Sequence, residues 1–278
     1  MCRLGIWGWA LLAVQPWLSV AGAASAPRPA PLASGPSVAG MWPRQPLAES
    51  LGTVPLQLTE STFEFSTVGH GIEGKLTPPR LQRAFERYKG IIFGQKTLWS
   101  NELQPEHSLP LHALSVRLSG AADLEAPPQL GDDESFQLSV SPAAATLDAT
   151  TFSGLHRGLE AFAQICIRVG DATIINSTNT TVMGKPKFAY RGLMVDTARH
   201  WQPVKELLQL LDGMAASSLN VFHWHLTDSQ SFPWNSSSQP KLVQGAYRPD
   251  LVYQRADLEA IVAYATDRAI RVIPEIGE

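Results

Sequence analysis

The chain has 278 residues, of which 44% are hydrophobic, and this is enough material for one large globular domain or two ordinary ones. The formal net charge is −3, and the charged residues are spread along the chain without a basic or acidic block. This pattern argues against nucleic acid and anionic membrane surfaces as partners.

Residues 1–23 have the pattern of a signal peptide. Arg3 supplies the positive charge, residues 4–14 form an apolar run, and residues 21–23 are small enough for cleavage. A membrane anchor is the alternative, because residues 17–24 extend the apolar stretch, but Pro16 interrupts it. We therefore predict cleavage and entry into the secretory pathway.

The cysteines and the glycosylation motifs bear on the same compartment. Cys2 would leave with the signal peptide, so Cys166 is either an unpaired buried thiol or one whose partner lies outside these residues. Acceptor triplets for N-glycosylation begin at Asn176, Asn179 and Asn235.

Composition and periodicity divide the rest of the chain at two places. Residues 24–40 are rich in Pro and Ala and are expected to form a tail without a core. Residues 41–185 mix strand-like alternation, as in 114–118 and 136–140, with apolar residues at helical spacing. The helical stripes contain Leu81, Phe85, Tyr88 and Ile92 in one case and Leu155, Leu159, Phe162 and Cys166 in the other.

We interpret residues 41–185 as an α+β domain, with two helices on one face of a small antiparallel sheet. Residues 120–133 contain prolines, acids and Gly131, and are expected to form a loop that joins the strand pair.

The pattern changes to alternating strands and helices over residues 186–278. Residues 189–196, 219–226 and 270–276 are the expected strands, and they are taken to be parallel and covered by helices. The helix between the first two begins near Pro203 and has an apolar stripe that contains Val204, Leu207, Leu208, Leu211, Met214 and Ala215. The stripe of the next helix contains Leu258, Ile261, Val262 and Ala265.

This βαβαβ order fits either a doubly wound sheet or a (β/α)8 barrel. The turn after Asp196 contains no glycine that would let a pyrophosphate approach the backbone. Dinucleotide binding is thus disfavoured, and we predict no cofactor.

Polar residues gather where the three expected strands end, which is where barrel enzymes carry their working residues. The first strand end has Asp196, Arg199 and His200, the second has His223, His225 and Asp228, and the third has Glu275. The guanidinium of Arg199 suits adjacent hydroxyls or a carboxylate, and its alternative is an ion pair with Asp196 or Asp228.

His223 and His225 point to the same side of their strand and raise the possibility of a metal site completed by Asp228 or Glu275. The apolar residues around them favour the other interpretation, in which they pack in layers and hydrogen-bond to acids. We predict no metal.

Two long segments resemble the first two barrel strands of β-N-acetylhexosaminidases of the lysosomal type, which form glycoside hydrolase family 20. Residues 190–200 read YRGLMVDTARH, and residues 219–233 read LNVFHWHLTDSQSFP. Residues 245–247 (GAY) and 270–275 (IRVIPE) continue the resemblance in order. Residues 41–43, 87–88, 133–138 and 154–162 extend it more loosely into the first domain.

The resemblance implies an α/β fold: an α+β N-terminal domain of a small antiparallel sheet plus helices, then about three strands of an incomplete (β/α)8 TIM barrel. It implies that Arg199 binds hydroxyls of the terminal sugar and that Asp228 is an active-site aspartate. The family releases terminal β-linked N-acetylglucosamine or N-acetylgalactosamine with retention, and the acetamido oxygen of the substrate is the nucleophile. N-acetylhexosamine-terminated glycans or chitooligosaccharides are the implied partners, and no nucleic acid or membrane span is implied.

The family uses consecutive Asp and Glu residues after a later strand to orient the acetamido group and protonate the leaving oxygen. Asp132, Asp133 and Glu134 are the acidic run of this kind, but they fall in the N-terminal domain, so no catalytic residue is assigned. Ser229 also replaces a second acid that is common beside Asp228.

We therefore expect a truncated β-N-acetylhexosaminidase that is inactive alone. The alternative is a non-catalytic fragment that binds sugar or pairs with a complete subunit. The full-length form is expected to be lysosomal, vacuolar or extracellular, with dimerisation possible.

Overall fold

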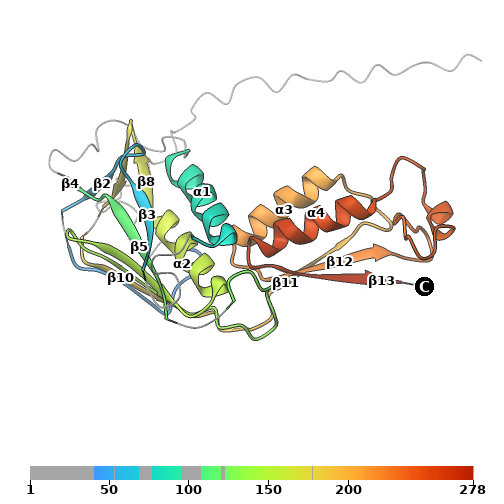
Figure 1. The fold of residues 1–278 in the computed structure, drawn as a ribbon, viewed down its shortest axis with the longest axis horizontal. Coiled ribbons are helices and arrows are strands. Elements are labelled where there is room, and N and C mark those ends of the chain that lie inside the picture. Colours follow the sequence, from blue (N-terminus) through green and yellow to red (C-terminus); the bar gives the residue numbers. More distant parts are fainter. Residues whose placement is uncertain are drawn as a thin grey trace, which may run out of the picture. The chain divides into compact units, whose positions relative to one another are not determined.

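The computed structural model describes residues 41–52, 54–68, 77–94, 108–119, 123–176 and 178–277 (Figure 1). The predicted signal peptide, the predicted tail and residues 120–122 of the predicted loop lie outside these ranges. Within the described part of the chain, no helix is long and apolar enough to cross a bilayer.

A six-stranded sheet forms the main part of the first half, in the order β1-β10-β6-β7-β5-β3. Its strands are β1 (Leu47–Ser50), β10 (Thr180–Gly184), β6 (Phe136–Val140), β7 (Ala145–Ala149), β5 (Ala113–Leu118) and β3 (Glu64–Val68). Alternate residues of β5 and β6 are buried, as the period of two in the sequence predicted.

The sheet was predicted to be antiparallel, but it is mixed: among the described residues, three of its five strand pairings are antiparallel and two are parallel. β3 runs parallel to β5 and β5 runs parallel to β7, whereas the pairings of β7 with β6, β6 with β10 and β10 with β1 are antiparallel. The strands that residues 120–133 connect, β5 and β6, are not neighbours, because β7 lies between them. Hydrophobic periodicity shows which face of a strand is buried but not which strand pairs with it or in which direction.

A second sheet of four strands was not anticipated. It has the order β4-β2-β9-β8, with β4 (Leu109–Pro110), β2 (Leu56–Leu58), β9 (Ala172–Ile175) and β8 (Cys166–Val169). Cys166 was predicted to continue a helix, but it is the residue at which that helix ends and β8 begins. Its thiol is buried and unpaired, and burial raises its pKa.

The two predicted helices of this half are α1 (Pro79–Phe93) and α2 (Phe152–Ile165). Pro79 occupies the first turn of α1, where a missing N–H costs little. The hydroxyl of Thr151 caps α2 by accepting the backbone N–H of Gly154 at 3.0 Å. α2 contacts β6, β7 and α1, and nearly all of its residues are buried, so it is the central element of this core.

The second half contains three parallel strands and two helices, as predicted. β11 (Gly192–Asp196), β12 (Val221–Thr227) and β13 (Arg271–Ile276) pair in that order, with α3 (Val204–Ala216) and α4 (Arg255–Thr266) between them in sequence. A short 3-10 helix (Leu242–Gly245) lies in the loop that follows β12. β11 and β12 begin two or three residues later than predicted.

The two helices lie side by side on one side of this sheet (Figure 1). Phe222, Trp224 and Leu226 of β12 pack into a core with Leu211 and Ile261 of the helices. Val262 was predicted to join this core, but it points outward on α4 and is exposed. The opposite face of the sheet carries the alternating residues of β12, His223 and His225.

Contacts between α1 and the end of α4 join the two halves. Arg83 of α1 donates from Nε and Nη2 to the Asp267 carboxylate, at 2.7 and 2.8 Å. Arg80 is buried and donates to the carbonyl oxygens of Thr266, Leu124 and Ala126. The buried guanidinium of Arg80 also lies over the Phe152 ring, 3.8 Å from its centroid.

Candidate active site

The ends of the three parallel strands bring three polar residues into one row. Asp196 of β11 pairs in register with His225 of β12, and His225 pairs with Glu275 of β13. Residues opposite each other in adjacent strands lie on the same face of a sheet, so the carboxyl ends of the strands meet as the sequence predicted.

Arg199 is fixed beside this row by the residue at the end of its own strand. The backbone N–H of Arg199 donates to Asp196 Oδ1 at 3.0 Å, and its Nη1 donates to Asp196 Oδ2 at 2.6 Å. Arg199 Nη2 also donates to Asp228 Oδ2 at 2.6 Å. An ion pair with Asp196 or Asp228 was the alternative role predicted for Arg199, and the structure contains both pairs.

A two-residue turn after β12 presents Asp228 and a further acceptor to Arg199. The backbones of Asp228 and Ser231 exchange two hydrogen bonds, of 3.0 and 3.1 Å, which closes the turn around Ser229 and Gln230. Gln230 Oε1 accepts from Arg199 Nε at 3.0 Å. Although three of its nitrogens are bonded, the Arg199 side chain remains 42% exposed.

Gln230 was not predicted from the sequence, because its contact with Arg199 depends on the turn that the backbones of Asp228 and Ser231 close. Ser229, which replaces the acid expected there, donates to Asp228 Oδ1 from its backbone N–H at 2.6 Å and from its hydroxyl at 2.9 Å. His200 belongs to the predicted set but is exposed, and its carbonyl oxygen accepts a hydrogen bond from Gln202.

His223 and His225 share one acid. Glu275 Oε2 lies 2.7 Å from His223 Nε2 and 2.8 Å from His225 Nδ1, and His225 Nε2 lies 3.0 Å from Asp228 Oδ2. The sequence left two interpretations of these histidines, a metal site or hydrogen bonds to acids, and the structure shows hydrogen bonds to acids. Across the described ranges of the chain, no three His, Cys, Asp or Glu side chains are arranged to hold a metal ion.

The pKa values of these groups follow from their hydrogen bonds. Bonds to Glu275 and then to Asp228 raise the pKa of His225. Hydrogen bonds from His225 and then from His223 lower the pKa of Glu275, whereas bonds from Ser229 contribute most to the lowered pKa of Asp228. Partial burial pushes the pKa of Asp196 upward, but the bonds from Arg199 outweigh it and the net shift is downward.

A buried aromatic group supports the segment that carries Arg199. Trp224 Nε1 donates to Thr197 Oγ1 at 2.7 Å, and the Thr197 backbone N–H donates to the carbonyl of His225 at 3.0 Å. The Trp224 ring meets Tyr253 edge to face, and the Tyr253 hydroxyl donates to the carbonyl of Gln202. These buried contacts hold the segment that carries Arg199 in place, while the Arg199 side chain stays exposed to solvent.

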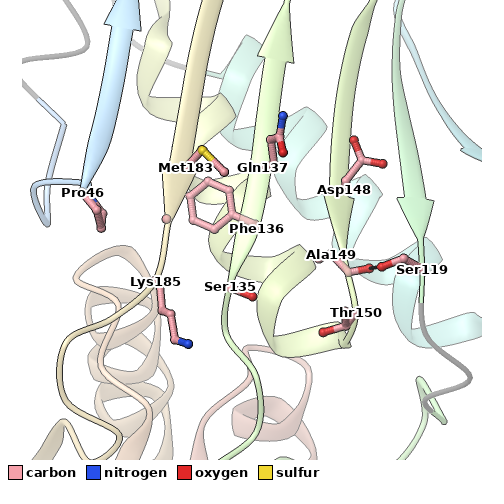
Figure 2. Close-up of a pocket in the computed structure, with 11 residues that line it drawn as sticks. Pro46, Ser119, Ser135, Phe136, Gln137, Asp148, Ala149, Thr150, Met183 and Lys185 are labelled. Carbon is pink, nitrogen blue, oxygen red and sulfur yellow. Dashed lines mark hydrogen bonds between the residues drawn. The ribbon is translucent and has the colours of Figure 1, made fainter.

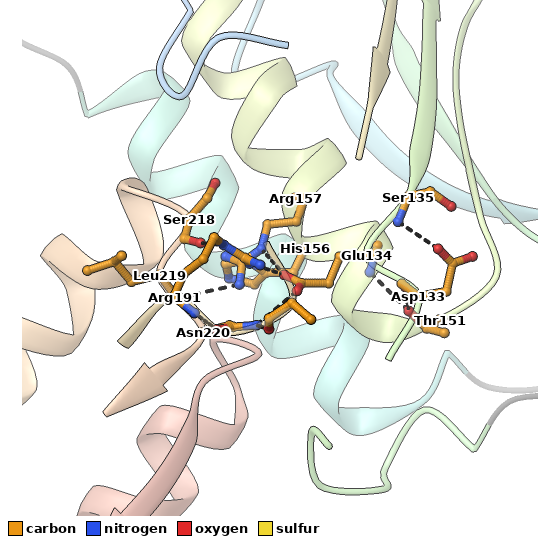
Figure 3. A network of polar contacts seen from close by, with 12 residues as sticks. Asp133, Glu134, Ser135, Thr151, His156, Arg157, Arg191, Ser218, Leu219 and Asn220 are labelled. Carbon is orange, nitrogen blue, oxygen red and sulfur yellow. Dashed lines mark hydrogen bonds and ion pairs between the residues drawn. The ribbon is translucent and has the colours of Figure 1, made fainter. Parts of the chain in front are cut away.

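The acidic run of the N-terminal half has a structural role. Glu134, which is 8% exposed, accepts from Arg157 and Arg191 and from Asn220 Nδ2 at 2.9 Å (Figure 3). Burial works against its ionised form, but the two arginines outweigh this and lower the pKa of Glu134. A carboxylate held ionised in this way cannot serve as a general acid.

Two cavities lie away from the Arg199 cluster. One, of about 400 Å³, opens on the six-stranded sheet and includes Phe136, Gln137, Asp148 and Lys185 (Figure 2). The other, of about 520 Å³, lies near Arg157 and Arg191.

Two segments of the chain match known families. Residues 188–278 match the family described as "Glycosyl hydrolase family 20, catalytic domain", and residues 41–165 match "beta-acetyl hexosaminidase like".

Curated relatives and solved structures agree with these matches. The chain is 37% identical over 250 residues to the beta-hexosaminidase subunit beta of Felis catus, covering 88% of this chain and 46% of that protein. It is 35% identical over 272 residues to beta-hexosaminidase 1 of Arabidopsis thaliana, covering 93% of this chain and 48% of that protein. The structure of Flavobacterium johnsoniae chitobiase superposes with a TM-score of 0.68 at 27% identity, covering 85% of this chain and 34% of that one.

The chain thus spans less than half the length of these relatives. Within that span both matched segments name the same family as the relatives do. The chain belongs, as a β-hexosaminidase-like sequence, to glycosyl hydrolase family 20.

Proposed function

We propose that this chain supplies part of the substrate site of a β-N-acetylhexosaminidase, with Arg199 and Asp228 binding hydroxyls of the terminal sugar. The supporting observation is the 2.6 Å contact between Arg199 Nη2 and Asp228 Oδ2 at the open ends of parallel strands. The pair offers N–H donors beside carboxylate acceptors, the combination that adjacent sugar hydroxyls require. β-linked N-acetylglucosamine or N-acetylgalactosamine is the substrate class that the family resemblance implies, and the relatives are named beta-hexosaminidases.

Binding, and not proton donation, is the role that the cluster supports. A glycosidase general acid needs a pKa raised toward the working pH. The pKa values of Asp196, Asp228 and Glu275 are all lowered by their partners. Glu160 has a raised pKa, but it is buried in the N-terminal half and accepts from Tyr88 and Gln164.

In the substrate-assisted mechanism the acetamido oxygen attacks the anomeric carbon and a carboxylic acid protonates the departing oxygen. We propose that the described residues hold the sugar for this reaction and that other residues of the enzyme provide the acid. The (β/α)8 barrel is the architecture proposed for the complete catalytic domain, with β11, β12 and β13 as its first strands.

Sugar binding by the purified 278-residue chain tests this proposal. Ligand-observed NMR or isothermal titration with N-acetylglucosamine should show saturable binding in the millimolar range, because the site is open. Arg199→Ala should weaken binding at least tenfold by removing charge-assisted bonds worth about 1.5 to 3 kcal/mol each.

Arg255→Ala is the matched control, since Arg255 is an exposed arginine paired with Glu259 on the surface of α4. Circular dichroism should show that both variants keep the fold. Equal binding by the wild type, Arg199→Ala and Arg255→Ala would refute the assignment of the sugar site. Release of 4-nitrophenol from 4-nitrophenyl N-acetyl-β-glucosaminide by the chain alone would refute the assignment of the acid elsewhere.

Pairing with another subunit is a second candidate function. Met194 of β11 is 53% exposed on the face of the sheet that α3 and α4 leave uncovered. Exposed apolar groups on a strand of this kind favour association. We propose on this ground that the 278-residue chain can pair with a complete subunit through this face.

We further propose a secretory route for the protein and the division predicted from its sequence. Residues 1–23 act as a signal peptide, residues 24–40 as a tail, 41–185 as the N-terminal domain and 186–278 as the partial catalytic domain. Asn179 and Asn235 are exposed and Asn176 is half-buried, so all three can be examined as glycan acceptors by mass spectrometry after glycosidase release. The lysosome, the vacuole and the cell exterior are the proposed destinations.

A further inference from the structure

The cavity of about 520 Å³ is lined by cationic side chains from three parts of the chain. Arg44 comes from the segment before β1, Arg157 from α2, and Lys185, Lys187 and Arg191 from the connection between β10 and β11. None of the residues that line it is acidic. Five cations around one hollow create a positive potential inside it.

Two of the acids near the cavity are already bonded, and a third, Asp148, borders the adjoining 400 Å³ pocket together with Lys185. Glu134 lies behind the wall and serves both Arg157 and Arg191 (Figure 3), so one carboxylate faces two guanidinium groups. Asp133 accepts from the Ser135 backbone N–H at 3.1 Å and from the Thr150 hydroxyl at 2.7 Å. The positive charge of the lining is therefore only partly compensated.

Arg157 shows this imbalance most clearly. Its side chain is 2% exposed; Nε donates to Glu134 Oε2 at 2.9 Å, and Nη2 donates to the Leu219 carbonyl at 3.3 Å. Nη1 is buried and has no hydrogen-bond partner. Buried guanidinium groups are normally satisfied, so Arg157, a residue that lines the cavity, keeps donor capacity that the described residues do not use.

The rest of the lining is apolar and suited to a ring. Phe136, Phe188 and three prolines complete the wall, and Lys187 Nζ lies 5.7 Å from the centroid of the Phe188 ring. A volume of this size lies within the range of pockets that hold small organic molecules and exceeds what a bare ion needs. Lys185 and Phe136 also border the 400 Å³ pocket, where Gln137 and Thr150 offer further polar groups (Figure 2).

We propose that this cavity binds a small organic oxyanion, namely a phosphate, sulfate or carboxylate group carried on a body the size of a monosaccharide. The anionic group lies among Lys185, Lys187, Arg44 and the arginine pair, and the body lies against Phe188 and the prolines. None of these residues belongs to the Arg199 cluster, so the proposal does not depend on the proposed function.

Isothermal titration of the 278-residue chain with three probes tests the proposal: inorganic phosphate, glucose 6-phosphate and glucose. Glucose 6-phosphate should bind with one site per chain, phosphate should bind more weakly, and glucose should not bind. Binding of glucose 6-phosphate should weaken as salt is added, because exposed charges are screened.

Lys185→Gln and Lys187→Gln are the informative variants, since both side chains are exposed and their replacement leaves the core unchanged. Each should weaken binding of glucose 6-phosphate about tenfold, the effect of losing one charge-assisted hydrogen bond. Lys205→Gln, an exposed lysine on α3, should bind as the wild type does.

Three results would overturn the proposal: no saturable heat with either phosphate probe, unchanged binding in the Lys185→Gln, Lys187→Gln double variant, or glucose binding as tightly as glucose 6-phosphate. If phosphate and glucose 6-phosphate bind equally well, the oxyanion part is supported and the sugar-sized body is overturned.

Discussion

Arg199 and His225 together hold three carboxylates at the strand ends. Asp196, Asp228 and Glu275 each accept from one or both of these cations. Each ring nitrogen of His225 faces a carboxylate, and only the doubly protonated imidazolium can donate from both. A sugar hydroxyl that enters the site would meet these charges in fixed positions, and the positive charge on His225 depends on pH.

The first prediction concerns the titration of His225. Its folded-state pKa is raised, so its stabilising contribution is fully present below the ordinary value of about 6.5 and is lost as pH rises through the folded value. Asp228→Asn removes one of the two acceptor charges. We expect the His225 ring signals to titrate at lower pH in this variant than in the wild type, as measured by NMR.

Asp250→Asn is the control, because Asp250 is an exposed carboxylate that pairs with Arg248. A His225 titration that is the same in both variants would contradict this account.

The pH dependence of stability has the opposite sign for Asp228 and Glu275. Their pKa values are lowered, so their stabilising contribution is present above pH about 4 and is lost as pH falls through the lowered values.

A second prediction at this scale concerns Glu134. Glu134→Gln leaves the buried Arg157 and the half-buried Arg191 without a counter-charge. We expect the free energy of unfolding to fall by about 3 kcal/mol, as for other broken buried ion pairs. Urea denaturation measures this change, and Glu86→Gln, at an exposed position on α1, should leave the midpoint unchanged. An unchanged midpoint for Glu134→Gln would contradict the role assigned to it.

Single residues were predictable from the sequence where strand ends alone determine their place. Asp196, His225, Asp228 and Glu275 all lie within two residues of the end of a strand, and parallel strands bring such positions together. Gln230 was not predictable, because its reach to Arg199 depends on the turn that Asp228 closes with Ser231. The role of Glu134 depends on arginines 23 and 57 residues away, which no local pattern reveals.

The packing of helices gives a prediction at the scale of elements. A Cβ atom at Gly154 of α2 would lie 2.4 Å from the Ser135 carbonyl oxygen, whereas one at Gly213 of α3 would meet nothing within 4 Å. Gly154→Ala should destabilise the protein by about 1 to 3 kcal/mol through overpacking. Gly213→Ala should stabilise it by about 0.5 to 1 kcal/mol, since alanine is the better helix former.

Thermal unfolding followed by circular dichroism measures both substitutions in one series. Tolerance of Gly154→Ala would show that the contact between α2 and the segment before β6 is looser than this distance indicates. Destabilisation by Gly213→Ala would show that the space around Gly213 on α3 is smaller than the structure indicates.

Helices and strands with a clear hydrophobic period were predicted from the sequence, whereas the pairing between strands was not. The stripes of α1, α3 and α4 and the alternation in β5 and β6 follow from local spacing alone. The parallel pairing of β3 with β5 joins residues about 50 positions apart, and β8 and β9 have few residues each. Neither long-range pairing nor very short strands leave a periodic signal.

The molecule as a whole exposes apolar side chains on its parallel sheet, and this predicts self-association. Met194 and Ile276 are both more than half exposed. Sedimentation velocity should show a weight-average mass that rises with concentration, and Met194→Lys should reduce it by placing a charge on the face. A monomer at all concentrations that also melts cooperatively at high temperature would contradict this prediction.

Arg80 restricts how the two halves can move. Its guanidinium lies between the carbonyl groups of Leu124, Ala126 and Thr266 and against the face of Phe152. Separating α1 from the end of α4 would remove a buried charge from these partners, which is costly. Arg80 therefore opposes relative movement of the two halves, together with the Arg83–Asp267 ion pair and the bonds from Arg191 and Asn220 to Glu134.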